Sequence, residues 1–427
     1  MKYSIRKYII IALIFLGGSG SPYWIYSQGV VESIDYLGLK KTKPAVLSRQ
    51  LLQGIGVPID SNLIHIDIQR IRNFPGIGNV AYQVDSLDGG LKIRYQIEEQ
   101  RTLLPILNFG GISGNVWYQM GFYDSNFLGY GNFFSAHYQN SDGRHSGQVF
   151  FRSPKNVKDH WGYSVSLARW ASVEPLFFLS RAVNYNFDYN SVSLTGIYNI
   201  GYRRQIEFGG TYFVENYEKL FDQETQVLPG PNQLRQPKLL GKLSYYQNHL
   251  NYHFFYLDGH DFNILFQDVF NTKDQSFFHI LMMTWRYFQN WNNDINMASR
   301  INFGISSNDA TPFAPFVVDS RVNLRGSGNR IDRGTAQLVW NIEFRKTHFH
   351  KKTWAGQWVA FSDLGSWRNP GGTLAEFWDP NQFRHFIGGG YRLIYKKIYG
   401  AILRVDYGVD IYNTSERGIV LGFGQYF

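Results

Sequence analysis

The chain has 427 residues, of which 17% are aromatic and only 18% are charged, with 43 glycines and no cysteine. It contains no run of about 20 apolar residues, which excludes a helical membrane protein, and its aromatic content excludes a disordered chain. Without cysteine there is no disulfide, thiol catalysis or lipid-modified cysteine anchor, and the composition with a mean hydropathy of −0.28 is typical of a transmembrane β-barrel.

The first segment has the pattern of a secretory signal peptide. Three basic residues among the first seven precede a short apolar run at 9–16 and the small residues 17–20. A retained membrane anchor is the alternative, but nothing downstream lengthens the apolar run. We expect residues 1–27 to be removed and the mature protein to leave the cytoplasm. This argues against nucleic acid as a partner, despite the formal net charge of +9.

Residues 28–99 predict a small α/β domain with the element order β-α-α-β-β. A strand at 30–39 is followed by a helix that starts near Pro44, with Leu47, Leu51 and Ile55 on one face. Asp60 is the expected N-cap of a second helix. Two alternating strands then flank a turn at 88–90. About 70 residues are enough for one compact core.

Residues 100–427 carry a long alternating pattern with no helical periodicity. In the strand at 335–346, apolar residues at even positions face polar residues at most odd positions, and residues 401–411 alternate in the same way. In water such a sheet needs a second layer to cover its apolar face, whereas in lipid it needs none. About 330 residues at roughly 20 per strand predict an antiparallel barrel of about sixteen strands. A water-soluble all-β secreted protein is the alternative.

Three motifs within the barrel region occur in a characteristic order. Arg325-Gly326-Ser327 lies in a long irregular segment at 306–334, Glu343 and Arg345 lie on the polar face of the next strand, and Phe361-Ser-Asp363-Leu-Gly365 follows. This set resembles the loop and wall motifs of the BamA/TamA superfamily of outer-membrane barrels. Ser327 stands where that superfamily has an aromatic residue.

The resemblance extends to both ends of the chain. The segments 38–43 and 95–99 make the N-terminal domain similar to a POTRA domain, of which this chain has one; a structural spacer or plug is the alternative. The segment 123–132 resembles an early barrel turn of the superfamily. At the C-terminus Phe423, Tyr426 and Phe427 resemble an outer-membrane insertion signal, with Phe423 and Phe427 on one strand face.

The resemblance implies that the long loop folds back into the barrel. Arg325 would then pair with Asp363 on the inner wall, with Glu343 close enough to share the charge. We interpret these charged residues as a structural ion network rather than an acid/base site. The two imidazoles of His348 and His350 lack a third clustered ligand, so we predict no metal site. We expect no cofactor and no enzymatic activity.

The function implied by the resemblance is assembly of proteins into the outer membrane of a Gram-negative bacterium, or protein transport across it. The POTRA-like domain would lie in the periplasm and bind unfolded client proteins by strand addition. Outer-membrane lipid and accessory subunits are the other implied partners. The alternative is a passive pore or a structural scaffold subunit that kept the fold without the activity.

Overall fold

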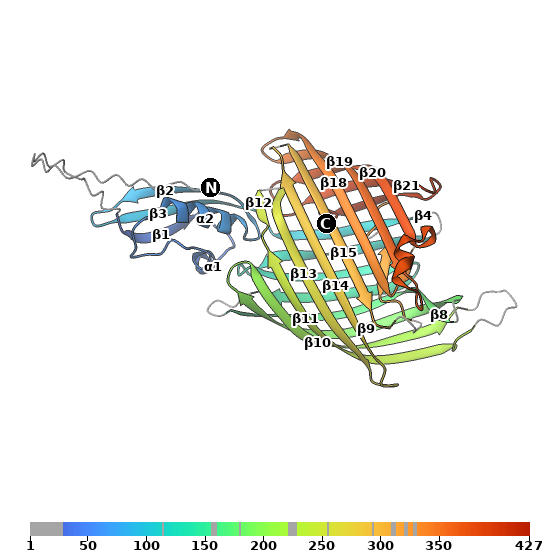
Figure 1. Cartoon of the computed structure of the whole chain (residues 1–427). Helices are drawn as coiled ribbons and strands as arrows, with labels where there is room; N and C mark the ends of the chain where they lie inside the picture. Colours follow the sequence, from blue (N-terminus) through green and yellow to red (C-terminus); the bar gives the residue numbers. More distant parts are fainter. Residues whose placement is uncertain are drawn as a thin grey trace, which may run out of the picture.

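The structure of the chain is a computed structural model, and a small N-terminal unit lies at one end of a large β-barrel (Figure 1). None of the described helices is long and apolar enough to cross a membrane. The predicted signal peptide, residues 1–27, lies outside the described residues. These are 29–112, 115–154, 160–178, 181–220, 229–253, 256–292, 294–308, 313–319, 323–327 and 331–427.

The N-terminal unit is a three-stranded sheet packed against two helices. Its central strand runs parallel to the first strand and antiparallel to the remaining one. Buried residues from both helices and all three strands form one apolar cluster, so the unit has a core of its own. The elements are β1 (Val31–Leu37), α1 (Pro44–Ser48), α2 (Ser61–Arg72), β2 (Ile77–Ser86) and the central strand β3 (Leu91–Glu99).

The two helices differ in how well the sequence pattern predicts them. The carboxylate of Asp60 accepts hydrogen bonds from N–H groups in the first turn of α2, as its cap position predicts. The prediction for the first helix was wrong at its end. Helix α1 stops at Ser48, and Ile55 is 63% exposed. The reason is that the backbone N–H groups of residues 52–53 donate to the Asp67 carboxylate instead of to helical carbonyls.

Sixteen antiparallel strands close the barrel within the described residues, in agreement with the predicted number. Each strand pairs with its neighbours in chain order. A short additional strand, β12 (Asn251–His253), pairs with the first residues of β13. The strands are β4 (Leu103–Ile112), β5 (Asn115–Phe127), β6 (Asn132–Ser141), β7 (Arg144–Ser153), β8 (Trp161–Phe178), β9 (Arg181–Ile200), β10 (Arg204–Lys219), β11 (Gln233–Asn248), β13 (Tyr256–Asn271), β14 (Phe277–Asn290), β15 (Ile295–Ser306), β18 (Ala336–His350), β19 (Trp354–Arg368), β20 (Phe383–Tyr395), β21 (Ile402–Asp410) and β22 (Arg417–Phe423).

The barrel wall has the apolar outer face that a membrane requires. On β18, Leu338, Trp340 and Phe344 are 37%, 45% and 42% exposed, whereas Asn341 and Glu343 between them are fully buried. Because side chains alternate along a strand, the exposed apolar residues share the outer face and the buried polar residues share the inner face. This alternation confirms the prediction of a transmembrane barrel and argues against the alternative of a water-soluble all-β protein.

The N-terminal unit is fastened to the barrel at the turn between β5 and β6. The Lys41 Nζ lies 2.5 Å from a carboxylate oxygen of Asp124, and Asn126 Nδ2 donates to the Thr42 hydroxyl at 2.7 Å. The backbone of this turn also accepts a hydrogen bond at Gly129, where φ is +82°. The turn motif therefore both reverses the chain and holds the N-terminal unit.

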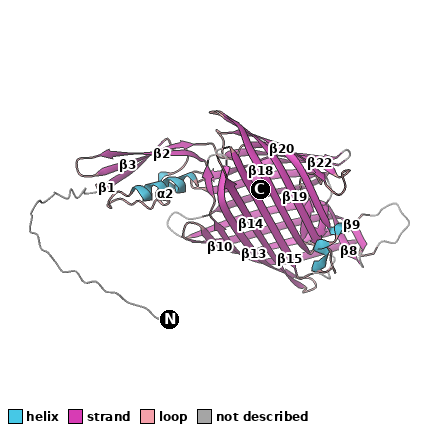
Figure 2. Cartoon of the chain, turned by 45° about the horizontal axis from the view of Figure 1, so that its top comes forward, coloured by secondary structure: helices cyan, strands magenta, loops and turns pink. Residues whose placement is uncertain are grey.

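A second contact joins α2 to two other barrel turns at the same end. The Arg70 guanidinium lies 4.5 Å from the centre of the Tyr202 ring, and the backbone N–H of Tyr252 donates to the Asn73 side chain at 3.0 Å. We call this end of the barrel, which carries the turns at Gly129, Tyr202 and Tyr252, the near end, and the opposite end the far end. Figure 2 shows the N-terminal unit at the near end from a second direction.

Candidate functional site

The loop between β15 and β18 starts at the far end and places its tip inside the barrel. It contains a short hairpin of β16 (Phe316–Asp319) and β17 (Ile331–Gly334). At the tip, Leu324 is 1% exposed and packs in an apolar cluster with wall residues. Gly326 adopts a φ of +100°, and a Cβ at this position would lie 2.6 Å from the carbonyl oxygen of Gly408 on the wall. Only glycine permits this turn against the wall. The other members of the apolar cluster are Val318, Val339, Trp367 and Phe386.

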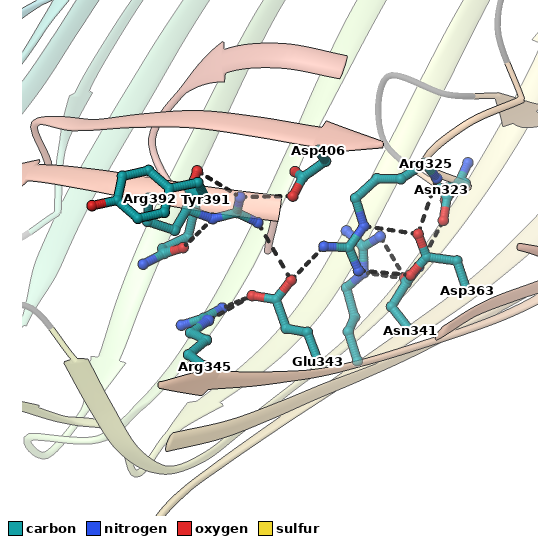
Figure 3. Close-up of polar contacts among 11 residues, drawn as sticks. Asn323, Arg325, Asn341, Glu343, Arg345, Asp363, Tyr391, Arg392 and Asp406 are labelled. Atoms are coloured by element: carbon teal, nitrogen blue, oxygen red, sulfur yellow. Dashed lines mark hydrogen bonds and ion pairs between the residues drawn. The ribbon is translucent and has the colours of Figure 1, made fainter. Parts of the chain in front are cut away.

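Arg325 is fully buried at the tip of this loop and pairs with two acids of the inner wall. Its Nε and Nη2 donate to the two carboxylate oxygens of Asp363 at 2.8 Å each, and its backbone N–H donates to the same carboxylate at 3.0 Å. Its Nη1 donates to Glu343 (Figure 3). The pair with Asp363 is bidentate, a geometry that only a guanidinium provides. The structure thus brings together three of the four charged residues of the loop and wall motifs, Arg325, Glu343 and Asp363.

The network continues from Glu343 around the inner wall. Arg345 Nε donates to the second oxygen of Glu343 at 2.5 Å, and Arg392 on β20 lies 3.7 Å from Glu343. Arg392 also donates to Asp406 on β21 at 2.7 Å. The side chains of Glu343, Arg392 and Asp406 are fully buried. Buried charges are tolerated when each has a partner, and this chain of ion pairs supplies one to each acid.

Asn341 adds neutral hydrogen bonds to the network. Its Nδ2 donates to Asp363 at 2.8 Å and to the backbone carbonyl of Asn323 in the loop at 2.7 Å (Figure 3). Its Oδ1 accepts hydrogen bonds from Arg300 on β15 at 2.7 and 3.0 Å. One side chain therefore links the loop tip to three strands of the wall, β15, β18 and β19.

Aromatic rings replace the missing aromatic residue of the loop motif. The Arg325 Cζ lies 3.8 Å from the centre of the Phe361 ring and 4.5 Å from that of Tyr426. Ser327 is half-buried, and its hydroxyl donates to the backbone carbonyl of Leu324. Rings over a guanidinium stabilise it through cation–π attraction. The apolar part of the tip's anchoring thus comes from the wall and the C-terminus.

Gly365, the glycine of the wall motif, lies under the loop tip. A Cβ at this position would come within 2.9 Å of the Leu324 side chain and 3.1 Å of Val318. These contacts are closer than side chains normally allow, so a larger residue at Gly365 would displace the loop. Phe361, Asp363 and Gly365 share one face of β19. Phe361 stacks on the Arg325 guanidinium, Asp363 pairs with it, and Gly365 leaves room for the Leu324 side chain.

The prediction for the end of the chain was wrong in one respect. Strand β22 ends at Phe423, and Gly424 adopts a φ of +84°. The chain then turns inward, so that Tyr426 is 7% exposed and Phe427 packs with Phe288 of the inner wall. Phe427 therefore does not share the outer face with Phe423. In both Figure 1 and Figure 2 the C-terminus lies within the outline of the barrel.

Several members of the network were not predicted as site residues. Arg392 and Asp406 lie on strands that carry no recognised motif, and Tyr426 was predicted only as part of the C-terminal insertion signal, not as a contact of Arg325. Period-two counting puts Arg404 and Asp406 on the polar face of β21, which marks them as inward residues. It does not identify their partners. His348 and His350, which we did not predict to bind a metal, lie on β18. Among the described residues no group of three His, Cys, Asp or Glu could hold a metal ion.

Comparisons with known proteins identify the fold. No protein-family model matches the chain, and no curated protein matches its sequence. The crystal structure of BamA from Haemophilus ducreyi lacking POTRA domains 1–3 is 15% identical, and the match covers 92% of this chain and 83% of that one with a TM-score of 0.53. The chain has the fold of that barrel.

Two further structures support the same assignment. CdiB from Escherichia coli is 9% identical, with 93% of this chain and 77% of that one covered and a TM-score of 0.61. CdiB from Acinetobacter baumannii is 11% identical, with 93% and 74% covered and a TM-score of 0.53. At these identities the similarity establishes the fold, and this is the fold that the resemblance to the BamA/TamA superfamily predicted.

Proposed function

We propose that this protein assists the insertion of proteins into the bacterial outer membrane or their translocation across it. The N-terminal unit then lies in the periplasm, so the near end of the barrel faces the periplasm and the far end faces outward. Its client is an unfolded polypeptide, and outer-membrane lipid surrounds the barrel. The fold shared with BamA and CdiB supports this proposal. In this proposal the Arg325 network holds the loop tip to the barrel wall and has no catalytic role.

The seam between the first and last barrel strands is the observation that carries the proposal. Within the described residues, β22 and β4 share a single register pair, Leu421 with Phe109, whereas β21 and β22 share seven. One further bond joins the Phe423 backbone N–H to the Asn108 side chain at 3.2 Å. A sheet edge with unpaired backbone groups is a template for an incoming strand. A client strand can therefore enter the wall at this seam.

The N-terminal unit offers a second edge for an extended client. Strand β2 pairs with β3 along one side, and its other side is an edge of the described sheet. The opposite edge strand is partly covered, because Val31 exchanges backbone hydrogen bonds with residues 56–57. Strand addition to an exposed edge supplies main-chain hydrogen bonds independently of client sequence. This favours β2 as the client-binding edge of a POTRA-like domain.

A disulfide across the seam tests whether it must open. The chain has no cysteine, so Phe109→Cys and Leu421→Cys introduce a single pair of thiols. Directly opposed residues on antiparallel strands lie within the Cα distance that a disulfide spans. We expect the oxidised double variant to lose client assembly and a reductant to restore it. The matched control, Val405→Cys with Leu421→Cys, locks β21 to β22 and should leave assembly intact. Full activity of the oxidised seam variant would remove the proposed mechanism.

Depletion followed by proteomics of the outer membrane separates the functional alternatives. Loss of many outer-membrane proteins supports an assembly role, and loss of a single exported protein supports a dedicated transporter. An unchanged outer-membrane and exported proteome contradicts both roles and leaves the passive pore or scaffold.

A further inference from the structure

The near half of the barrel lumen contains a polar cavity that borders the Arg325 network at Arg300, which donates to Asn341. Its volume is about 590 Å³, and inward side chains of β7, β10, β11, β13, β14 and β15 line it together with Phe427. Water reaches its charged groups, since the side chains of Arg152, Lys242 and Arg286 are 22%, 24% and 33% exposed. Three of these strands, β10, β11 and β13, lead to the turns at Tyr202 and Tyr252 that contact the N-terminal unit. The cavity therefore faces that unit.

The far half of the lumen contains a second cavity of about 430 Å³, which residues of the loop and mainly apolar residues of the wall line. Phe213 on β10 and Phe316 on the loop are 6% and 2% exposed and belong to one apolar cluster. Lys238 is 3% exposed, lies 2.6 Å from Glu215 and stands 4.0 Å from the centre of the Phe313 ring of the loop. The far cavity is therefore lined mainly by apolar and aromatic side chains, whereas the near cavity, which we call the vestibule, is lined mainly by polar and charged ones.

Positive charge exceeds negative charge among the described residues that line the vestibule. Four cations face two acids, Glu207 and Asp261. Asp261 accepts a hydrogen bond from Arg286 Nε at 2.9 Å, and Glu207 accepts one from Arg152 at 2.6 Å. Lys242 lies 3.9 Å from Glu207, whose closer partner is Arg152. The cations are Arg152, Lys242, Arg286 and Arg300.

The arrangement of this charge decides which kind of anion it fits. The cations stand on four different strands, and two of them are already bonded to acids, so the excess charge is spread along the wall. A compact dianion such as phosphate is held best where several donors converge on one point. A diffuse positive potential in a concave, water-filled space instead attracts an extended chain of negative charges.

We infer that the vestibule is a binding site for acidic segments of an unfolded client polypeptide. This inference rests on the proposed function, and it names the chemistry of the client that the barrel receives. A segment that leaves the exposed edge of β2 reaches the near end of the barrel, where the positive potential attracts aspartate and glutamate side chains. Arg300 donates to Asn341, whereas within the described part of the chain the Nζ of Lys242 has only Glu207 at 3.9 Å, an acid whose closer partner is Arg152, so we expect Lys242 to contribute most to the selectivity.

The test measures peptide binding to the full-length protein in nanodiscs of uncharged lipid. The probes are three unstructured peptides of equal length, acidic, neutral and basic, each labelled with an uncharged fluorophore and followed by anisotropy. We expect the acidic peptide to bind tightest and to weaken as salt is added. Lys242→Gln should weaken it roughly fivefold, the effect of one charge at a water-accessible site. The matched control, Lys273→Gln, removes an exposed lysine in the turn between β13 and β14 and should change nothing.

Three outcomes overturn the inference. Equal binding of the three peptides, or an acidic peptide that binds Lys242→Gln as well as wild type, means that the vestibule does not select acidic segments. Displacement of the peptide by inorganic phosphate at matched ionic strength, with saturable phosphate binding that depends on Lys242, means that the site takes a compact anion. Each of these results leaves the depletion experiment unaffected, whereas an unchanged proteome on depletion removes the proposed function without altering the peptide measurement.

Discussion

The guanidinium of Arg325 lies 4.5 Å from the centre of the Tyr426 ring, so the tip of the long loop contacts the last residues of the chain. Tyr426 also lies 4.9 Å from the Arg404 guanidinium, and Gln425 accepts a hydrogen bond from Arg392 at 3.3 Å. The C-terminal residues follow the seam strand β22 directly. The loop tip and the seam are therefore mechanically connected, and a change at one should be measurable at the other.

Removal of the Arg325 side chain should destabilise the barrel. Arg325→Ala leaves the buried Asp363 without its counter-charge and removes one of the cations around Glu343, at a cost of about 3–5 kcal/mol. Arg325→Lys should recover part of this, because lysine cannot form the bidentate pair. The measurement is the temperature at which the compact form, which migrates faster on an unheated gel, converts to the unfolded form. Arg169→Ala, on the outer wall with a side chain 62% exposed, is the control and should convert at the wild-type temperature. An unchanged temperature for Arg325→Ala would contradict the buried pair.

Removal of the Tyr426 ring should loosen the loop tip. Tyr426→Ala loses a desolvated cation–π contact worth about 2 kcal/mol, and Tyr426→Phe should keep most of it. Because the chain has no cysteine, Ser327→Cys gives a single thiol at the tip whose rate of alkylation reports its exposure. We expect faster alkylation in the Tyr426→Ala background. A thiol at Lys273 should react at the same rate in both backgrounds, and equal rates at position 327 would show that the ring does not hold the tip.

Loss of the Asp124 carboxylate should release the N-terminal unit. Asp124 pairs with Lys41 and accepts hydrogen bonds from the Thr102 hydroxyl and the Asn126 backbone N–H. Asp124→Ala leaves the buried N–H without a partner and costs about 1–3 kcal/mol. Spin labels on the N-terminal unit and on the barrel should then give a broader distance distribution. Asp85→Ala breaks an ion pair within the N-terminal unit alone and should leave the distribution narrow. A narrow distribution for Asp124→Ala would mean that the other contacts suffice.

The attachment of the segment 40–42 should depend on pH through Glu99. Burial raises the pKa of Glu99, but hydrogen bonds from the Thr42 hydroxyl and from the backbone N–H groups of residues 40–42 outweigh burial and lower the pKa below its usual value. A carboxylate with a lowered folded-state pKa stabilises the fold above its unfolded pKa of about 4.3, and this stability is lost as the pH falls through the folded-state pKa. Hydrogen-exchange protection of these N–H groups should therefore decrease on acidification.

The Glu99→Gln variant provides the control for this pH dependence. It should lose about 1–3 kcal/mol of protection at neutral pH, because the amide replaces the charged acceptor. Its protection should then change little with pH. A wild-type protection factor that stays constant as the pH falls well below about 4 would show that another group fixes this segment.

Local sequence patterns determined the architecture of this protein. Alternation with a period of two identifies barrel strands and their lipid-facing residues without any knowledge of partners, because successive side chains on a strand point to opposite faces. It also placed Glu343 and Asp363 on inner faces of β18 and β19, and the motif order then associated Arg325 with them. The helix cap at Asp60 is equally local, since the carboxylate bonds N–H groups two and three residues away.

The tertiary structure alone decided which inward residues meet. Arg392 and Asp406 carry no motif, and their pairing follows from the register between β20 and β21, which long-range strand alignment sets. The inward turn of the chain depends on a positive φ at Gly424, and past that glycine the alternation no longer predicts the direction of Phe427. The cation-rich vestibule likewise appears only when six strands curve around one space. Period and motif report what a residue's own strand does, whereas partners, seams and cavities depend on where other strands lie in space.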